Sequence, residues 1–581
     1  MAGGGEHNEA QLLRSFAIRA KKNEETTLGF ILVLAGIGLL FTLFHLIRQS
    51  NHWLMRRTGA SKLPSFITAI PRSIRKLSLR RAIGLPSLGH ATIVTIFFAL
   101  NVVGLLVNLD NKAMALVTNI ASRSAWLAVA NLLFVIFFAL KNTPLAFLTA
   151  WSYERLNCLH RISGYAAVVH TIVHTVCYSY YFPSVGRGSM LLRTSDIMGI
   201  VAGGSWVLLA LAAVLIRRWW YELFYYLHVV LWMVSIVTLA LHQPRLATKV
   251  AIGTVVAGAM WGLDRIIRLF RLMIHSTNNT ATLTPLPNGG TRVTLSKMPM
   301  GAISGKHAFL WIPRIRLFET HPFTIASADP LEFVIASQVG FTGDLHKYAL
   351  ANPGVPLKAS IEGPYGTVPD PSAFETVVLV AGGSGASFTI GLAHAVLRRI
   401  TRNTTKRVVF IWVVKYNSYL KWFADHLITL GNDARFSILV FVTRSDPPQS
   451  RLGSDASISK EMEKISINNA YVDKSQMRII HPSSLSSSID LEQSRRPSDN
   501  DSIFTSSSCR PVDFHGIPIN YQRPDVATII REAIGDTSVD ERVLVTGCGP
   551  AKLMHLMRET TTDCIQAEGP SIELHCEQFG W

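Results

Sequence analysis

Long apolar runs are concentrated in the first 275 residues of the chain, and shorter apolar stretches separated by turns follow them. A run of about 20 apolar residues is long enough to cross a bilayer as a helix. Seven runs meet this description, although the third is short: 28–47, 91–109, 126–140, 162–182, 197–216, 225–241 and 250–269. The pattern predicts an α-helical membrane bundle of about seven spans, with residues 88–271 as its main unit.

The N-terminal region lacks the basic start, short apolar core and small-residue cleavage site of a signal peptide. We therefore predict a polar tail over 1–27, a retained first helix over 28–47 and a basic loop over 48–87. Lys and Arg in short loops mark the cytosolic side of a membrane protein. With the 48–87 loop in the cytosol, 17 such residues lie inside and 10 outside, which predicts a cytosolic C-terminal half.

Composition supports the membrane interpretation. The chain is 49% hydrophobic and only 16% charged, so a disordered chain is excluded. A net charge of +18 raises nucleic-acid binding as a candidate, but no basic stripe with a nucleic-acid motif accompanies it. Nine of the positive residues lie in the 48–87 loop, which makes much of the excess a topology signal. The six cysteines form no CxxC metal pair and no disulfide framework.

Two predicted spans carry histidines at the same spacing. His160 and His174 lie 14 residues apart in one span, and His228 and His242 lie 14 apart in another. Fourteen residues fall about 40° short of four helical turns, so each pair lies on one face about 21 Å apart along the axis. Both helices run from inside to outside in the predicted topology. His160 should therefore lie level with His228, and His174 with His242.

Two cross-helix imidazole pairs at two depths suit two stacked haems, each held by two axial histidines. Gly164, near His160, would let a flat macrocycle approach the helix backbone. His170 lies one turn before His174 on nearly the same face and is an alternative to it as a ligand. Histidines that only hydrogen-bond helices together are the competing interpretation. The identical spacing of the two pairs favours haem.

From about residue 275 the pattern changes to short strands and turns, which predicts a β-barrel over 275–372. Strands at 280–285 and 291–296 flank a Pro-Asn-Gly-Gly hairpin turn. The later sequence His-Pro-Phe-Thr presents a ring and a hydroxyl suited to a flavin edge. A Gly-Phe-Thr ending at Thr342 offers a hydroxyl and backbone N–H groups to a pyrophosphate. Either motif alone is also typical of an ordinary barrel loop.

Residues 373–581 alternate strands and helices, which predicts a doubly wound α/β sheet. One buried strand ends in a Gly-Gly-Ser-Gly turn before a helix, and the last ends in Gly-Cys-Gly-Pro. Backbone N–H groups at such a helix start bind phosphate, and ligands of these sheets bind at strand C-termini. Between the two turns, residues from about 444 to 520 are rich in Ser, Asp and Pro and predict a disordered insertion.

The order of these motifs resembles the fungal ferric-chelate reductases of the ferric reductase/NADPH oxidase superfamily, which are flavocytochromes of the b type. The resemblance covers nearly everything from residue 91 to 581. It implies a di-haem membrane bundle followed by a ferredoxin-reductase-like module, with an antiparallel FAD barrel and an NADPH-binding α/β domain. The implied cofactors are FAD, NADPH and two haem b groups.

The resemblance also implies roles for individual residues. The haem ligands would be His160, His174, His228 and His242. The FAD contacts would be His321, Pro322, Phe323, Thr324, Ser327 and Thr342. The NADPH contacts would be Gly382, Gly383, Ser384, Gly385, Lys415, Gly547, Cys548, Gly549 and Pro550, with Lys415 at the 2′-phosphate. Phe579 or Trp581 would cover the flavin ring. Relatives often have a basic residue after Gly-Phe-Thr, where this chain has Gly343 and Asp344.

The leading hypothesis is a multi-pass metalloreductase that moves electrons from cytosolic NADPH to Fe(III) chelates, or Cu(II), outside. The plasma membrane is the expected location, with a vacuolar or other membrane as the alternative. Implied partners are the ferric chelate, the bilayer and an oxidase or permease of iron uptake, with no nucleic acid. Superoxide production from O₂ is the alternative function. A transporter with a non-catalytic cytosolic domain is a remote one, because the histidine pairs and cytosolic motifs are intact.

Overall fold

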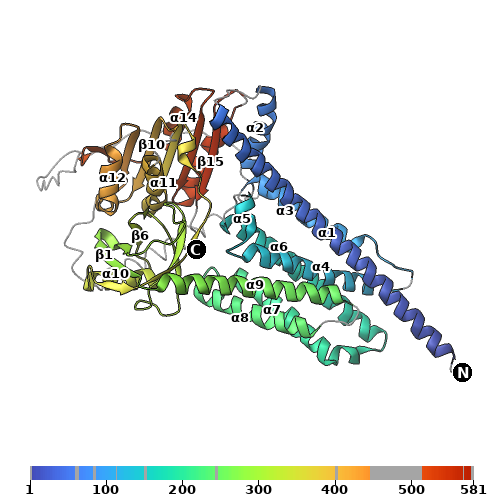
Figure 1. Cartoon of the computed structure of the whole chain (residues 1–581). Coiled ribbons are helices and arrows are strands. Elements are labelled where there is room, and N and C mark those ends of the chain that lie inside the picture. Colours follow the sequence, from blue (N-terminus) through green and yellow to red (C-terminus); the bar gives the residue numbers. More distant parts are fainter. Residues whose placement is uncertain are drawn as a thin grey trace, which may run out of the picture.

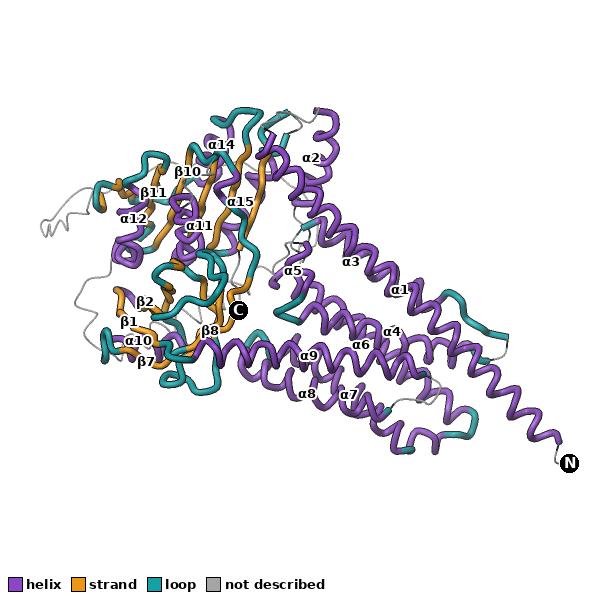
Figure 2. Tube along the Cα trace, in the orientation of Figure 1, coloured by secondary structure: helices purple, strands orange, loops and turns teal. Residues whose placement is uncertain are grey.

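The computed structural model of the chain describes residues 3–58, 65–80, 82, 85, 87–112, 114–149, 153–242, 247–398, 404–444, 513–566 and 568–577. A bundle of long helices comes first, and a β-barrel and an α/β unit follow it (Figure 1). The strands are confined to the two C-terminal units, and the helices of the bundle project away from them (Figure 2). The predicted order of fold classes is therefore confirmed.

Six of the described helices are long and apolar enough to cross a membrane. They are α1 (Gly3–Thr58), α3 (Leu88–Leu106), α4 (Leu116–Ala139), α7 (Thr194–Leu215), α8 (Tyr221–Leu241) and α9 (Thr248–Ser276). The remaining predicted span, 162–182, is part of α6 (Tyr153–Ser184), whose histidines and tyrosines make it less apolar. A short helix, α5 (Pro144–Thr149), precedes α6.

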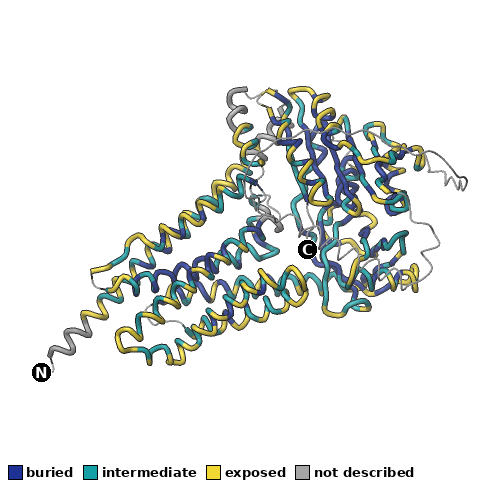
Figure 3. Tube along the Cα trace, turned by 180° about the vertical axis from the view of Figure 1, so that it is seen from behind, coloured by how far each residue is buried: buried dark blue, intermediate teal, exposed yellow. Residues whose placement is uncertain are grey.

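Helix α4 is the most enclosed of these six helices, since 61% of the residues in its most apolar stretch are buried. Exposed residues, coloured yellow, recur along the surrounding helices, whereas the buried residues of the bundle are concentrated in its interior (Figure 3). Many of them are large and apolar, such as Leu211, Val237 and Leu263. Soluble proteins rarely expose contiguous apolar surface of this kind, which suits contact with lipid.

Helix α1 crosses the predicted boundary between the polar tail and the first span without a break. Asn23, in the predicted tail, donates from Nδ2 to Ser122 Oγ at 2.9 Å and accepts from Arg123 Nε at 2.7 Å. The tail is also rich in Ala, Leu, Arg and Lys, which favour helix. It is thus helical from Gly3, because its polar side chains find partners on α4.

The predicted basic loop also contains a helix, α2 (Ser65–Leu79). Arg72 Nη1 donates to the Gly569 carbonyl at 2.9 Å, and Lys76 Nζ donates to the Ile565 carbonyl at 3.1 Å. Leu79 packs against a core cluster of the α/β unit. The basic residues here therefore also serve contacts with the C-terminal unit.

The barrel unit consists of two antiparallel sheets. The first has the order β5 (Ser327–Ala328), β6 (Leu331–Ala336), β2 (Gly290–Leu295), β1 (Thr280–Leu286) and β7 (Pro356–Lys358). The second has the order β4 (His321–Thr324), β3 (His307–Trp311) and β8 (Ser360–Tyr365). The predicted hairpin is the β1–β2 pair, and α10 (Phe341–Ala351) completes the shared core.

The α/β unit has a seven-stranded sheet with the order β12-β13-β11-β10-β9-β14-β15. Its strands are β9 (Thr376–Gly382), β10 (Arg407–Val414), β11 (Phe436–Val442), β12 (Asp513–Phe514), β13 (Ile517–Asn520), β14 (Arg542–Cys548) and β15 (Ser571–Glu577). All pair in parallel except β12 with β13. Helices α11 (Ala386–Arg398) and α12 (Ala424–Gly431) cover one face, and α14 (Val526–Gly535) and α15 (Ala551–Asp563) the other. The predicted doubly wound sheet is confirmed.

The end of the predicted insertion differs from the structure. Residues 445–512 lie outside the described residues, but β12 and β13 occupy 513–520. Ile517 and Ile519 of β13 are buried, and β13 pairs with β11. The sheet therefore resumes at Asp513 rather than after residue 520, because two alternating isoleucines suffice for this short strand.

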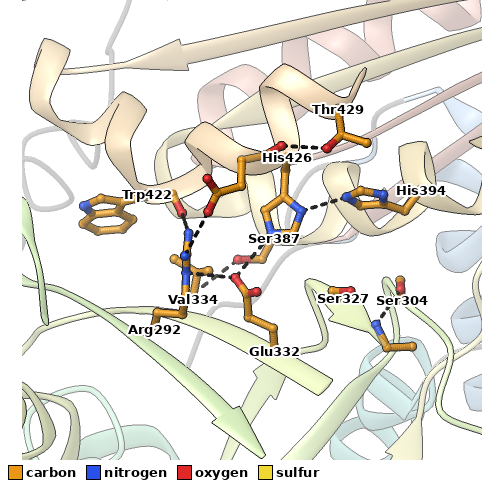
Figure 4. Close-up of polar contacts among 12 residues, drawn as sticks. Arg292, Ser304, Ser327, Glu332, Val334, Ser387, His394, Trp422, His426 and Thr429 are labelled. Atoms are coloured by element: carbon orange, nitrogen blue, oxygen red, sulfur yellow. Dashed lines mark hydrogen bonds and ion pairs between the residues drawn. The ribbon is translucent and has the colours of Figure 1, made fainter. Parts of the chain in front are cut away.

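A chain of polar contacts joins the barrel to the α/β unit (Figure 4). Arg292 Nε lies 3.1 Å from Glu332 Oε1, which also lies 3.3 Å from His426 Nε2. His426 Nδ1 lies 2.7 Å from His394 Nε2. Burial, together with His426 and Arg398, lowers the pKa of His394 to about 4. The contacts link β2 and β6 to α12 and α11, and so tie the two units together.

Candidate functional site

The structure brings the four spaced histidines together in two pairs across the bundle. The ring centroids of His160 on α6 and His228 on α8 lie 6.1 Å apart, with an interplanar angle of 60°. Those of His174 on α6 and His242, directly after α8, lie 6.2 Å apart at 75°. The equal spacing therefore produces two pairs at two depths, as the helical geometry predicts. We call His160 with His228 the inner pair, because it lies beside a cavity that reaches the C-terminal units, and His174 with His242 the outer pair.

Three of these imidazoles are oriented by backbone carbonyl groups of other helices. Nδ1 of His160 donates to Val135 O at 2.9 Å, and Nδ1 of His174 donates to Ala121 O at 2.9 Å. Nδ1 of His242 donates to the carbonyl of Ser195 at 2.7 Å. A hydrogen bond from one ring nitrogen fixes the tautomer and leaves Nε2 as the metal-binding atom. Among described atoms, Nδ1 of His228 has no hydrogen-bond partner.

Gly199 of α7 makes room for the His242 ring. A Cβ atom at Gly199 would lie 2.5 Å from His242 Nδ1. Nothing lies within 4 Å of a Cβ atom built at Gly204 on the same helix. The outer pair therefore depends on glycine at position 199. The sequence does not predict this role, since a lone glycine in an apolar run has no distinctive pattern.

His170 has a different environment from the paired histidines. Its Nε2 donates to Asn101 Oδ1 at 3.1 Å, and the same oxygen accepts from Asn131 Nδ2 at 2.7 Å. All three side chains are buried. Because its Nε2 is engaged by Asn101, the geometry favours His174 over His170 as the partner of His242.

A cavity of about 1810 Å³ lies beside the inner pair and extends to the C-terminal units. His160, Gly164 and His228 line one part of it, and Val368 and His575 line another. Open space around the Cβ position of Gly164 agrees with a close approach of a flat group.

The imidazole nitrogens of the two pairs fit the axial positions of a metal-bound macrocycle. Imidazole nitrogen binds metal ions at about 2 Å, so two opposed rings with an ion between them have centroids roughly 6 Å apart. Both pairs match this separation. Within the described ranges, no group of three or more His, Cys, Asp or Glu side chains could hold a bare metal ion. Opposed pairs of this kind fit axial ligation of haem, whose macrocycle supplies the remaining ligands.

The His-Pro-Phe-Thr motif forms β4, the edge strand of the smaller barrel sheet. All four of its residues are half-buried. The His321 ring stacks on Phe341 at 4.4 Å between centroids, and its Nε2 lies 3.0 Å from Glu319 Oε2. Ser327 differs from these four residues, since it is buried and donates to Asp329 O at 3.3 Å.

The Gly-Phe-Thr motif forms the turn into α10, an arrangement suited to a phosphate. Gly340 has a φ of 91°, which favours glycine, and Thr342 Oγ1 accepts from the backbone N–H of Gln338 at 2.9 Å. Arg316 Nη2 lies 2.6 Å from Asp344 Oδ2. A basic group is therefore present beside this turn, although it comes from a distant part of the barrel.

The two glycine turns of the α/β unit lie side by side at the C-terminal edge of its sheet. β9 and β14 are neighbours, with Ala381 opposite Cys548. A Cβ atom at Gly382 would lie 2.5 Å from Pro550 Cδ, and one at Gly385 would collide with the Cys548 carbonyl oxygen. Glycine is thus required by the close approach of the two turns.

Other predicted nucleotide residues lie at the same edge. Lys415 is exposed directly after β10, the strand next to β9. Burial, together with Glu577 and Cys576, raises the pKa of the Cys548 thiol to about 12, so this thiol is neutral at physiological pH. Phe579 and Trp581 lie outside the described residues.

Comparison with known families agrees with this arrangement. The family described as "Ferric reductase like transmembrane component" matches residues 124–239. "FAD-binding domain" matches 276–369, and "Ferric reductase NAD binding domain" matches 374–562. The fold and the three matches together define a membrane-bound flavoprotein oxidoreductase.

Curated relatives point to the same family. The chain is 24% identical over 519 residues to ferric reductase transmembrane component 3 of Saccharomyces cerevisiae, covering 86% of this chain and 67% of the relative. It is 28% identical over 343 residues to a probable cell surface ferric reductase of Aspergillus oryzae, covering 53% and 45%. The chain spans about half to two thirds of the length of these relatives.

Likeness to solved structures is weaker. A ferredoxin NADP⁺ reductase from Neisseria gonorrhoeae with bound FAD and NADP is 14% identical, with a TM-score of 0.30, covering 51% of this chain and 97% of that one. The family matches and the curated relatives are the stronger findings: the chain combines a ferric-reductase-like transmembrane component with an FAD-binding domain and a ferric reductase NAD-binding domain, and its curated fungal relatives are named as ferric reductase components.

Proposed function

We propose that this protein is a transmembrane metalloreductase that moves electrons from NADPH to Fe(III) chelates, or Cu(II), across a membrane. The observation that carries the proposal is the presence of two opposed histidine pairs at two depths, the inner one beside a cavity that reaches the nucleotide unit. A bundle with one pair, or with pairs on unrelated faces, would not support transfer across its whole depth.

The residues of each unit have separate tasks in this proposal. When bound, FAD would supply a hydride acceptor for NADPH, and two haem b groups would supply single-electron transfer through the bundle. The Gly382–Gly385 turn and the α11 N-terminus bind the nucleotide phosphates, with Lys415 at the 2′-phosphate. Strand β4 and the turn before α10 hold the flavin. His160 with His228, and His174 with His242, supply the axial nitrogens.

Specific placement in the cell is also part of the proposal. The Lys and Arg distribution supports a cytosolic C-terminal half and reduction on the opposite side, at the plasma membrane. Supply of reduced iron to an oxidase or permease would follow. One relative, from Candida albicans, is named a ferric/cupric reductase transmembrane component, which favours a metal acceptor over O₂.

NADPH-driven reduction by purified protein in proteoliposomes tests the proposal. Fe(III)–citrate and O₂ are compared as acceptors, with superoxide dismutase added in parallel reactions. Iron reduction that persists with the dismutase is expected. Loss of all iron reduction on its addition would show that the protein is a superoxide-producing oxidase instead.

A further inference from the structure

Charged and polar side chains are concentrated where the bundle meets the barrel. Arg268 near the end of α9 forms a bidentate contact with Glu362 of β8, with Nη2 3.0 Å from Oε2. The two side chains are only 11% and 4% exposed. Tyr365 of the same strand donates to Glu362 Oε1 at 2.7 Å. A buried bidentate pair holds its two elements in one relative position, since both bonds are lost if either element shifts.

Lys141, in the turn after α4, makes a second contact between the two units. Its Nζ atom lies 3.0 Å from the centroid of the Phe309 ring on β3. Burial, with Arg268 nearby, lowers the pKa of Lys141 well below its usual range, and Glu362 opposes this shift. The aromatic face of Phe309 and the Glu362 carboxylate favour the charged amine, which burial disfavours.

Further hydrogen bonds surround these two contacts. On the membrane side, Arg271 Nη1 donates to Asn142 Oδ1 at 2.6 Å, and Asn142 Nδ2 donates to Asp264 Oδ1 at 2.9 Å. On the barrel side, His275 Nδ1 donates to Ile361 O at 2.9 Å. The end of α9, the turn after α4, and strands β3 and β8 thus form one junction, which we define by Lys141, Arg268, Phe309, Glu362 and Tyr365.

The junction lies between the inner histidine pair and strand β4, which carries the His-Pro-Phe-Thr motif. Val135, whose carbonyl accepts from His160, lies on α4 shortly before Lys141. Phe309, beneath Lys141, is the register partner of Pro322 in the His-Pro-Phe-Thr strand. One side of the junction therefore continues into the helix that orients His160, and the other into the strand proposed to hold the flavin.

We propose that this junction positions the flavin barrel against the inner histidine pair and thereby sets the rate of the flavin-to-haem electron step. Lys141, Arg268 and Glu362 are positioning residues, since none of them touches the reacting groups. When bound, reduced FAD would supply the electron for this step, and the haem iron held by the inner pair would accept it and pass from Fe(III) to Fe(II). This inference rests on the proposed function, and it adds a dedicated control point between the two cofactors.

The test uses the full-length protein in nanodiscs, loaded with FAD and haem and mixed anaerobically with NADPH. Glu362→Gln and Lys141→Met should leave flavin bleaching at the wild-type rate. Haem reduction should slow by roughly tenfold to a hundredfold, because small misplacements of reacting groups have effects of that size. Hydrogen–deuterium exchange should increase in β8 and at the end of α9, which reports the loosened junction independently of activity.

Lys358→Gln, at an exposed position of β7 in the same barrel, is the matched control and should change neither rate. Wild-type haem reduction in both junction variants, with both cofactors retained, would overturn the inference but not the proposed function. A wild-type protein without haem bands would overturn the proposed function itself. If Glu362→Gln does not assemble, the double variant Arg268→Glu with Glu362→Arg, which exchanges the two charges, replaces it. Haem reduction at the wild-type rate in this variant would support the positioning role of the pair. An assembled double variant with slow haem reduction would contradict that role.

Discussion

His160 on α6 and His228 on α8 face one another across the bundle, with ring centroids 6.1 Å apart. His174 and His242 repeat this relationship at 6.2 Å, at the other depth. The separation fits two imidazoles on opposite sides of one metal ion. Because each pair takes one histidine from each helix, both pairs depend on the packing of the same two helices.

Substitution of His174 and of His170 should have different consequences. His174→Ala is expected to remove about half of the bound haem, because one of two axial pairs is broken. His170→Ala should retain both haems, since its Nε2 is bonded to Asn101 rather than facing His242. Pyridine haemochrome content per flavin measures the difference. A loss of haem in His170→Ala alone would transfer the ligand role to His170.

Gly199→Ala should selectively damage the outer pair. The added methyl group would lie 2.5 Å from His242 Nδ1, so the ring must move. Overpacking of this kind costs about 1–3 kcal/mol in a packed core. We expect the outer haem to be lost or shifted in its absorbance spectrum while the inner haem is unchanged. Gly204→Ala on the same helix has open space and is the control; an identical spectrum in both variants would refute the assignment.

Gly385→Ala should weaken nucleotide binding without affecting haem. Its Cβ atom would collide with the Cys548 carbonyl oxygen and separate the two glycine turns. The KM for NADPH should rise and flavin reduction should slow, with haem content unchanged. Gly535→Ala, where nothing lies within 4 Å, provides the comparison. Unaltered NADPH kinetics in Gly385→Ala would exclude this turn from the nucleotide site.

Lys415→Ala tests the choice between NADPH and NADH. A hydrogen bond to a charged group contributes about 1.5–3 kcal/mol, which corresponds to a rise of roughly tenfold or more in the KM for NADPH. The KM for NADH should stay constant, because NADH lacks the 2′-phosphate. Steady-state flavin reduction with both nucleotides measures this. Equal effects on the two would place Lys415 elsewhere than at the 2′-phosphate.

The contact between the barrel and the α/β unit should weaken in acid. Burial holds the pKa of His394 near 4, below its ordinary value of 6.5, so folding favours the neutral ring. The contribution of the neutral His394 ring to the free energy of unfolding is fully present above pH 6.5 and is lost as the pH falls toward 4. This loss of free energy amounts to about 3 kcal/mol at most. The temperature of flavin release should fall over this range, and less steeply in His394→Gln than in the exposed control His555→Gln. If the temperature of flavin release falls equally with pH in the two variants, His394 is not the group responsible.

Periodicity explains why the histidine pairs could be predicted and their supports could not. The spacing of 14 residues places side chains on one helix face whatever the fold, so it is visible in the sequence. The carbonyl groups of Val135, Ala121 and Ser195 belong to other helices and have no side-chain signature. Only the packing of the bundle brings them to the imidazoles.

The same distinction applies to the C-terminal units. Glycine turns at strand ends are local patterns, and a doubly wound sheet is indicated by the alternation of strands and helices. The order of the strands in that sheet was not predicted. Arg316 beside Asp344 depends on a contact between separate parts of the barrel. The junction of Lys141 with Phe309 depends on the docking of two units. Neither contact could be derived from sequence spacing.

The most direct test of transmembrane electron transfer uses sealed proteoliposomes that contain an Fe(III) chelate, with NADPH added outside. Only molecules with the nucleotide unit facing outward can react. We expect Fe(II) to accumulate inside the vesicles, and we expect His174→Ala to abolish this accumulation while flavin reduction continues. Internal Fe(II) formation at the wild-type rate in His174→Ala would contradict transfer through the two histidine pairs.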